Sequence, residues 1–321
     1  MDQTNCDNNV TNDDIHSHSS FKKLAKINGM INDMTIDELR HRLSQLTLEV
    51  SGSEDSCRRR LKNHYRNETM KRVFNKSITY YYDIICVVDF EATCDSPQSD
   101  DLIQEIIEFP AVLVDVKQRK IVSTFHEFVK PKSTQKLSEF CTKLTGISQS
   151  IVDKSQPFVE VLDKFDKWFN SYINNNNIKS YAFATDGPWD LCHFFALTCK
   201  IYDITLPSYA RQWINIRKVF TNQYKRQQLS LDQMLTHLGM EFKGRKHYGF
   251  DDAINIANLL IRMITDGANP TINQEISCHK SDRNRWTNIK CGYVSINHNK
   301  SSINSNDSDS DNSTFKDINN K

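Results

Sequence analysis

Five consecutive apolar residues that run into two carboxylates constrain the fold of this chain more than any other feature. Ile84 to Val88 has the pattern of a buried strand, and Asp89-Phe90-Glu91 follows it directly. Side chains two positions apart on a strand project from the same face, so Asp89 and Glu91 should converge. Such a pair needs a proton or a cation between its charges, and Mg²⁺ prefers oxygen ligands. Carboxylates at a strand end can also be solvated turn residues, and the pair alone leaves both interpretations open.

Two later segments add more carboxylates and a histidine. Residues 181–185 predict a second short buried strand, which leads through residues 186–190 into a helical apolar pattern. Nearer the C-terminus, His247 and the five residues after it precede a helix whose apolar residues recur at i, i+3, i+4 and i+7. Alone, an Asp at a helix start is often only an N-cap, and a single histidine is more often a surface residue. The order in which these groups occur is more specific than any one of them.

In this order and spacing, the residues resemble the motifs of the DEDDh superfamily of 3′→5′ exonucleases, which share a ribonuclease H-like fold. The matching positions are Asp89, Glu91, Asp190, His247 and Asp252. Asp190, which follows an aromatic residue, fits the second motif better than Asp186 does, and Asp251 is left as a neighbour of the third. The resemblance implies an α/β domain in which helices flank a mixed sheet.

Four further stretches are similar to ERI-type (enhanced-RNAi) exoribonucleases, a group that includes the histone-mRNA 3′-end exonuclease. They are residues 89–94, 106–110, 144–147 and 213–218, and the similarity extends over about residues 82–272. The resemblance implies 3′–5′ hydrolysis of RNA, on stem-loops or on duplexes with a short 3′ overhang. The resemblance leaves open whether the enzyme acts in histone mRNA decay, RNA interference or rRNA processing.

The resemblance also implies chemical roles for the matching residues. The four carboxylates would hold two Mg²⁺ ions about 4 Å apart, with Mn²⁺ as a substitute. His247 in its neutral form would take the proton of the attacking water. The products would be nucleoside 5′-monophosphates.

Recognition of the 3′ end needs groups that separate the last base from its neighbour. Trp189 and Tyr248 each adjoin a matching residue, and aromatic side chains so placed can stack on bases. Leu144 is similar to the family's terminal-base wedge, and backbone amides near Phe90 and Ala92 are candidates for contacts to the terminal hydroxyls. Core packing is the alternative for Leu144 and Trp189. A contact to the 2′-OH would favour RNA over DNA.

A separate pattern lies upstream of the exonuclease stretch. Thr35 and Glu38 form a capping box, and Ser51-Gly52-Ser53 separates the short helix that follows from a second one. The outer surface of the second helix is expected to carry the basic residues Arg58, Arg59, Arg60 and Lys62. Two short helices with one basic face resemble a SAP domain, which implies docking on nucleic-acid phosphates. A solvated basic face is the alternative.

Length and composition suit this organisation. The chain has 321 residues, 38% of them hydrophobic, and a net charge of only +1, so local basic patches must provide the affinity for RNA. The expected segments are a disordered polar N-terminus (1–30), the SAP-like module (34–68), a linker (69–81), the exonuclease domain (82–272) and a polar, largely disordered tail (273–321).

Cysteine usage and hydropathy indicate the cellular compartment in which the protein is expected to work. Nine cysteines without paired spacing indicate reduced thiols, which is typical of the cytoplasm or nucleus, the nucleolus included. Cys278, His279 and Cys291 lack a fourth ligand at suitable spacing and make a poor zinc site. Neither a secretory signal nor a membrane span is expected. We expect a monomer whose partner is RNA with a structured 3′ end, with ribonucleoproteins or ribosomes as candidate assemblies. A DNA 3′–5′ exonuclease and a non-catalytic RNA-binding protein are the alternative functions.

Overall fold

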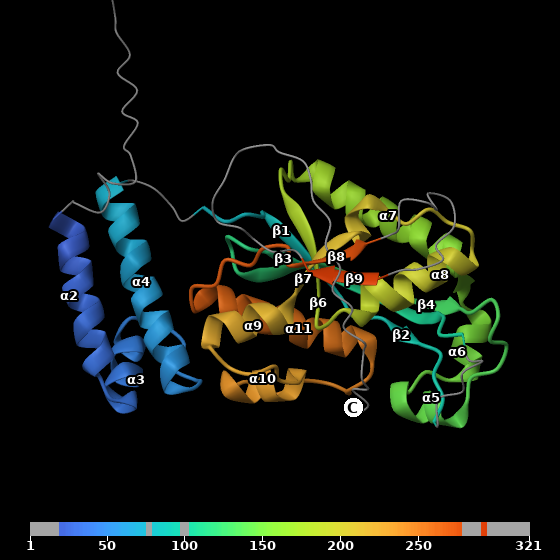
Figure 1. Ribbon diagram of the computed structural model, residues 1–321, viewed down its shortest axis with the longest axis horizontal. Helices are drawn as coiled ribbons and strands as arrows, with labels where there is room; N and C mark the ends of the chain where they lie inside the picture. The colour runs from blue at the N-terminus through green and yellow to red at the C-terminus, as the bar shows by residue number, and fades with distance from the viewer. Residues whose placement is uncertain (1–18, 75–78, 97–102, 278–289, 294–321) are drawn as a thin grey trace, which may run out of the picture.

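A mixed β-sheet forms the centre of the computed structural model, which describes residues 19–74, 79–96, 103–277 and 290–293 (Figure 1). The strands are β1 (Ile84–Val88), β2 (Glu91–Ala92), β3 (Ile106–Asp115), β4 (Lys120–Lys130), β5 (Gln156–Pro157), β6 (Tyr181–Thr185), β7 (Gln212–Asn215), β8 (Gln274–Ser277) and β9 (Lys290–Tyr293). Their order is β5-β4-β3-β1-β6-β7-β8-β9, and β2 pairs with β3. The expected α/β fold is therefore confirmed.

The first strand occupies the middle of the sheet and is buried along its whole length. β1 pairs with β3 in antiparallel and with β6 in parallel orientation. Ile84, Cys86 and Val88 point into one hydrophobic core, and Ile85 and Val87 point into another. A strand covered on both faces needs a continuous apolar run, which is why the sequence pattern identified it.

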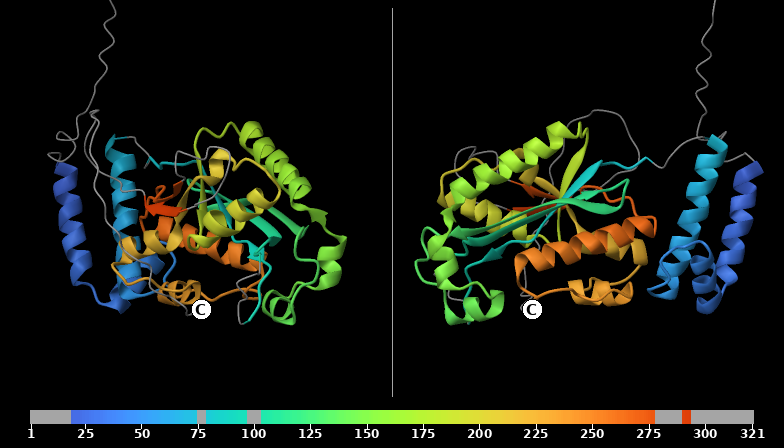
Figure 2. Two further views of the ribbon diagram at one scale, coloured as in Figure 1. Left: turned by 45° about the vertical axis from the view of Figure 1, so that its right-hand side comes forward. Right: turned by 180° about the vertical axis from the view of Figure 1, so that it is seen from behind.

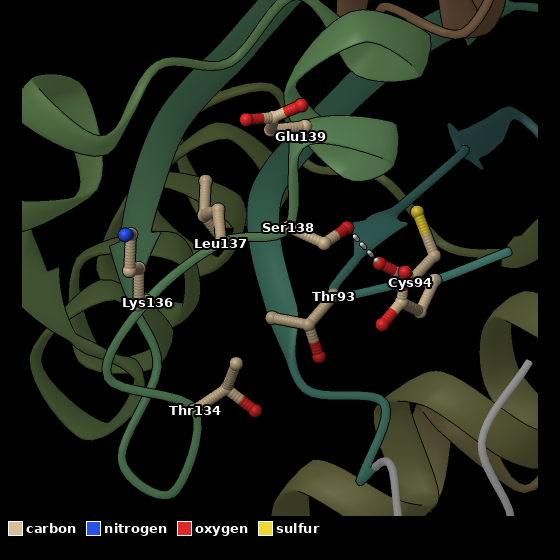
Figure 3. Close-up of a pocket in the computed structure, with 8 residues that line it drawn as sticks. Thr93, Cys94, Thr134, Lys136, Leu137, Ser138 and Glu139 are labelled. Carbon is tan, nitrogen blue, oxygen red and sulfur yellow. Dashed lines mark hydrogen bonds between the residues drawn. The ribbon is translucent and has the colours of Figure 1, made fainter.

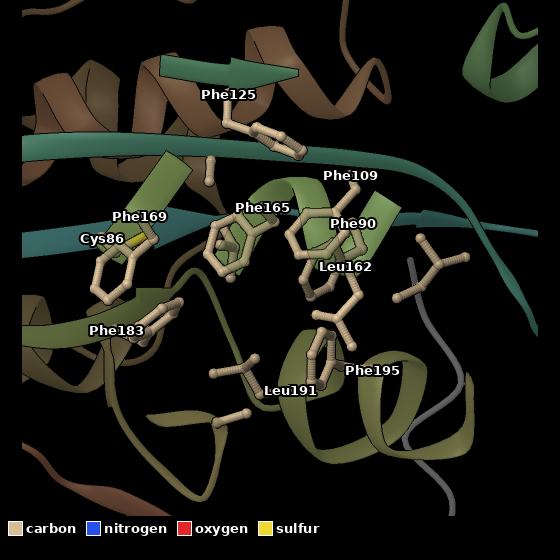
Figure 4. Packing of buried hydrophobic residues seen from close by; sticks show 14 of the residues in the cluster. Cys86, Phe90, Phe109, Phe125, Leu162, Phe165, Phe169, Phe183, Leu191 and Phe195 are labelled. Carbon is tan, nitrogen blue, oxygen red and sulfur yellow. The ribbon is translucent and has the colours of Figure 1, made fainter. Parts of the chain in front are cut away.

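Helices cover both faces of this sheet (Figure 2). One side is packed by α7 (Phe158–Asn175), the π-helix η1 (Asp190–Phe195) and α8 (Ala196–Ile201). Aromatic rings from α7, from η1 and from the strands beneath them form the cluster in Figure 4. The other side is packed by α9 (Ile216–Tyr224), α10 (Leu231–His237) and α11 (Gly249–Thr265). Smaller elements complete the domain: α5 (Glu139–Thr145), α6 (Gln149–Lys154) and the 3₁₀-helix η2 (Ser208–Ala210).

The N-terminal module consists of helices α2 (Ser19–Asp33), α3 (Ile36–Gln45) and α4 (Glu54–Phe74), which lie beside the sheet domain (Figures 1 and 2). Thr35 caps α3 in the expected capping box with Glu38. The module has its own small core, formed by Ile31, Leu39, Leu43, Cys57 and Leu61. No helix of the described residues is both long and apolar enough to cross a bilayer.

Three expected boundaries are wrong. Helix α2 occupies part of the N-terminus expected to be disordered, and its Ile31 is buried in the small core of the module. Helix α4 continues to Phe74, past the expected end of the module at 68 and into the segment expected as a linker. Two short strands lie within the tail expected to be largely disordered, and they extend the sheet past residue 272: β8 and β9 pair with each other, and β8 also pairs with β7.

Arg60 is a further correction, since it does not lie on an exposed basic face. Its side chain is 1% exposed and forms an ion pair of 2.8 Å with Asp266, at the end of α11. Ser56 and Tyr224 donate hydrogen bonds of 2.5 and 2.9 Å to the same carboxylate. Arg60 therefore attaches the module to the sheet domain. The residues of the weak zinc alternative lie outside the described part, apart from the backbone of Cys291.

Candidate active site

Three carboxylates from separate elements meet at one edge of the sheet. Asp89 follows β1, Glu91 begins β2, and Asp252 lies in the first turn of α11, and their oxygen atoms lie within 4.8 Å of one another. The convergence expected for Asp89 and Glu91 is confirmed, although the chain leaves β1 between them and Glu91 pairs with Glu108 of β3. The third member comes from the far end of the domain, as the resemblance implied.

Asp190 lies beside this group. Its Oδ1 accepts a hydrogen bond of 2.9 Å from the backbone amide of Phe90, which stands between Asp89 and Glu91. Asp190 opens a π-helix where the sequence predicted an α-helix, and such turns are frequent at functional sites. The Phe90 amide is thereby occupied in this structure, and the expected contacts between backbone amides near Phe90 and Ala92 and the terminal hydroxyls stay predictions. The Phe90 ring is buried 4.8 Å from the ring of Phe109.

The negative charges of the clustered carboxylates repel one another strongly. Burial, followed by the charges of Asp190 and Asp252, holds the pKa of Asp89 well above its ordinary value. Burial and the charge of Glu108 do the same to the pKa of Glu91. Burial raises the pKa of Asp252 to about 7, although the backbone amides of His247 and Tyr248 donate to its carboxylate and oppose this effect. A site of this kind holds either protons or a cation.

The donor set fits divalent metal ions. All the convergent side chains offer carboxylate oxygens, which hard cations prefer. Oδ2 of Asp252 is buried and accepts no hydrogen bond from the described residues, so it retains a lone pair for a ligand. Asp251 is different, because its Oδ2 accepts the backbone N–H of Arg245 at 2.7 Å. Asp252 is therefore the ligand candidate of the pair, as expected.

His247 is exposed on the loop before α11, where it adopts a positive φ of 59°. Contacts on both sides hold this loop. The Arg245 guanidinium donates to the carbonyl oxygens of Lys143 (2.7 Å) and Leu144 at the end of α5, and Lys246 pairs with Asp232. The backbone of the loop is thus fixed at several points, and the backbone amide of His247 donates to the Asp252 carboxylate.

Glu108 is a functional residue that the sequence analysis missed. Its buried carboxylate accepts the amides of Gly249 (2.9 Å) and Phe250 (3.1 Å) at the start of α11, and a bond of 2.8 Å joins it to His126. A Cβ at Gly249 would come within 2.6 Å of the Asp89 carbonyl oxygen, so this approach requires glycine. The acid within the otherwise apolar pattern of residues 106–114 was the signal available in the sequence.

The side chains expected to contact the substrate differ in how far they are exposed to solvent. The Trp189 side chain is 56% exposed, so it is free to stack on a base. Tyr248 is half-buried, with its ring 5.7 Å from that of His126. Leu144 is half-buried near the end of α5, and Ala92 is buried in β2. The stacking and wedge roles of these residues stay predictions.

A hollow of about 280 Å³ opens where the chain leaves β2 and enters α5 (Figure 3). Its lining includes Thr93, Cys94 and Lys136, and Ser138 donates a hydrogen bond of 2.8 Å to the Cys94 carbonyl oxygen. Cys94 stands three residues after Glu91 in the sequence, and none of the four expected metal ligands lines the hollow.

Comparison with known proteins identifies the family. The family model described as "Exonuclease" matches residues 86–260, which contain all five residues of the expected motifs. "3′-5′ exoribonuclease 1" of Rattus norvegicus is 42% identical over 258 residues, covering 80% of this chain and 74% of its own. This chain is an ERI1-type 3′–5′ exoribonuclease of the DEDDh family. The Schizosaccharomyces pombe "3′-5′ exonuclease eri1" is 29% identical over 280 residues, covering 78% and 91% of the two chains.

Solved structures agree with this membership. A structure described as "3′-end specific recognition of histone mRNA stem-loop by 3′-exonuclease" has a TM-score of 0.64 and 37% identity, covering 88% of this chain and 94% of its own. The nuclease domain of 3′hExo, "a DEDDh family member, bound to rAMP", has a TM-score of 0.59 and 41% identity, covering 61% and 98%. The expected exonuclease activity, hydrolysis of RNA from its 3′ end, is thus confirmed at the level of the family.

Proposed function

We propose that this exoribonuclease trims structured RNA, a stem-loop or duplex with a short 3′ overhang, and uses two Mg²⁺ ions for which Mn²⁺ can substitute. The convergence of Asp89, Glu91 and Asp252 within 4.8 Å carries the proposal of metal-dependent hydrolysis. The RNA class is supported by the resemblance to relatives, one of which is described with a histone mRNA stem-loop.

The residues of the site divide the chemistry between them. When bound, the two ions would lower the pKa of the attacking water and stabilise the departing 3′ oxygen. Asp89, Glu91, Asp190 and Asp252 would hold the ions. His247, exposed on its tethered loop, takes the proton from the water in its neutral form. The nucleoside 5′-monophosphate is then released from the 3′ end.

The N-terminal module is proposed to dock the RNA stem, in the manner of a SAP domain. Residues 19–74 contain twelve Lys and Arg against seven Asp and Glu, a formal charge of +5, although the whole chain carries only +1. Arg58 and Arg59 are partly exposed and pair with Glu54 and Asp55 on their own helix, and Lys62 bonds to Asn32. A duplex stem presents a regular row of phosphates that such cations can contact without reading bases.

The setting and assembly of the enzyme are also proposals. The cysteines that the structure describes carry free thiols, which supports work in the cytoplasm, the nucleus or both. We expect the protein to act as a monomer, with ribonucleoproteins or ribosomes as the assemblies that present its RNA.

Matched RNA and DNA oligomers test this function directly. Each has a stem and a short 3′ tail, and degradation is followed with Mg²⁺, with Mn²⁺ and with chelator. The proposal expects nucleoside monophosphates from the RNA in either metal and none in chelator. Faster hydrolysis of the DNA would instead support a DNA exonuclease, and RNA binding without hydrolysis would support a non-catalytic protein.

A further inference from the structure

Asp186 stands next to Asp89 at the same edge of the sheet, although it is not one of the residues implied by the family motifs. In the parallel pairing of β1 with β6, Val87 is opposite Ala184, and Asp89 and Asp186 each follow this pair by two residues. The charge of Asp186 acts on Asp89, as expected for neighbours at the strand ends. Neighbouring strands lie about 4.8 Å apart. Asp186 is only 9% exposed, so its carboxylate is an additional buried acid at the metal site.

Arg217, at the start of α9, is the counter-ion of Asp186. Its guanidinium donates to Oδ2 of Asp186 through Nε, at 3.0 Å, and through a terminal nitrogen. Its backbone amide also donates to the Asp186 carbonyl oxygen, at 3.3 Å. Three bonds from one residue thus hold the turn that leads to Trp189 and Asp190. An arginine with this many bonds is pre-organised and not easily replaced by lysine.

The two oxygens of the Asp186 carboxylate have different environments. Oδ2 accepts both bonds from Arg217, whereas Oδ1 is buried and accepts no hydrogen bond from the described residues. A buried carboxylate oxygen without a partner is costly, which indicates that a donor outside the protein satisfies it. Asp186 contributes to the raised pKa values of both Asp89 and Asp252, so its charge acts on the metal site.

We propose that Asp186 and Arg217 form a positioning pair for the divalent metal site. Arg217 fixes the Asp186 carboxylate at the strand edge and occupies one of its oxygens, and Oδ1 accepts a hydrogen bond from a water molecule bound to a metal ion. The charges of Asp186 and Arg217 cancel each other. The four negative charges of the expected ligands therefore balance the four positive charges of two divalent ions. This inference rests on the metal-dependent function proposed above, and it adds two residues to that site.

Substitutions of the two partners should change metal affinity in opposite directions. Asp186→Asn leaves an unpaired cation beside the site and should weaken Mn²⁺ binding by about tenfold. Arg217→Met leaves an extra carboxylate and should strengthen Mn²⁺ binding by a similar factor. The double variant Asp186→Asn/Arg217→Met should bind Mn²⁺ within about threefold of the unsubstituted protein. A pair that serves only to support the fold would weaken binding in both single variants.

The experiment measures Mn²⁺ affinity by calorimetry and by electron paramagnetic resonance on the RNA-free full chain, with melting temperatures for every variant. Lys164→Met, which removes a cation from the exposed pair with Glu127, is the matched control and should leave Mn²⁺ affinity unchanged. Arg217→Lys retains the charge without the bidentate geometry that orients Asp186, so it should weaken Mn²⁺ binding by less than Asp186→Asn does, and Arg217→Gln replaces Arg217→Met if that variant fails to fold. The positioning pair would be refuted if Asp186→Asn and Arg217→Met changed Mn²⁺ affinity in the same direction, or if Asp186→Asn left Mn²⁺ affinity unchanged. Absence of Mn²⁺ binding by the unsubstituted protein would instead overturn the proposed function.

Discussion

Glu108 of β3 accepts a hydrogen bond of 2.9 Å from the backbone amide of Gly249, at the start of α11. This bond connects the centre of the sheet to the helix that carries Asp252. The same carboxylate accepts the Phe250 amide and bonds to His126, while Gly249 fits against the Asp89 carbonyl oxygen. Strand β3 therefore positions two parts of the active site at once.

We expect Glu108→Gln to lower kcat by about ten- to a hundredfold with little change in RNA affinity, because a shift of reacting groups is costly to the reaction. The side-chain NH₂ group of Gln cannot accept hydrogen bonds, so one backbone donor would be left unpaired. The removal of charge-assisted bonds should also cost about 1.5–3 kcal/mol of stability. Chemical denaturation and steady-state kinetics measure both effects, and Glu127→Gln on the exposed side of β4 is the control. Unchanged kcat in Glu108→Gln would refute its positioning role.

Asp89→Asn and Glu91→Gln should each reduce hydrolysis by about 10³-fold or more, since each removes a ligand charge with almost no change in volume. RNA binding should persist, because the basic module does not depend on these residues. Calorimetry with Mn²⁺ and an RNA-binding assay check the two statements. Normal two-ion binding in an inactive variant would show that the residue acts in some other way.

The stability of the metal-free protein should fall as the pH rises from about 4 to 7. Burial raises the pKa of Asp252 to about 7 in the folded protein, whereas an unfolded Asp titrates near 3.9. The folded state therefore binds more protons across this window and loses that advantage as the pH rises through the folded value. Melting temperatures in chelator should show this slope, and Asp252→Asn should reduce it, with the remainder due to the raised pKa values of Asp89 and Glu91. Added Mg²⁺ should stabilise the unsubstituted protein more at pH 8 than at pH 5.

If His247 is the general base, activity at saturating metal should fall as the pH drops below about 6.5, where a histidine gains its proton. Saturating metal keeps the carboxylates ionised, so their titration does not obscure this acidic limb. His247→Ala should lower turnover strongly and remove the limb. An unchanged limb in that variant would assign it to a different group.

Arg58, Arg59 and Lys62 should contribute to stem-loop affinity by neutralising phosphates of the stem. Replacing all three by Ala should weaken binding of a stem-loop and leave hydrolysis of short single-stranded RNA nearly unchanged. The dependence of log affinity on log salt should become shallower, by about 0.9 for each phosphate that is no longer neutralised, with the duplex DNA value as the guide. Equal salt slopes for the two proteins would mean that the module does not dock RNA through this face.

Arg60 should behave differently from its neighbours, because it is buried against Asp266. Asp266→Asn leaves the guanidinium without its charged partner and should destabilise the protein by about 3–5 kcal/mol. The double variant Arg60→Met/Asp266→Leu should recover much of that stability, since apolar replacements of a buried pair are often tolerated. Denaturation curves of the single and double variants decide whether the pair is the attachment that the structure indicates.

The sequence by itself determined the central strand and the residues of the candidate site. An apolar run is sufficient to predict a strand buried on both faces, and the order and spacing of the motifs identified Asp89, Glu91, Asp190 and Asp252 as candidates, although Glu91 lies on β2 and Asp190 in a π-helix. The capping box of α3 was also readable, because its bonds join residues three positions apart. Local periodicity and local hydrogen bonds are properties that a short stretch of chain carries within itself.

Only the tertiary structure decided the roles of Arg60, Glu108 and Asp186. On a helical pattern Arg60 is one of a row of exposed cations, but its partner Asp266 lies 206 residues away and buries it. Glu108 and Gly249 are 141 residues apart, and the role proposed for Asp186 depends on two parallel strands that end side by side. Burial, ion pairing and strand register depend on contacts between segments that are far apart in the sequence. Such contacts form only when the chain folds, so a local sequence pattern does not predict them.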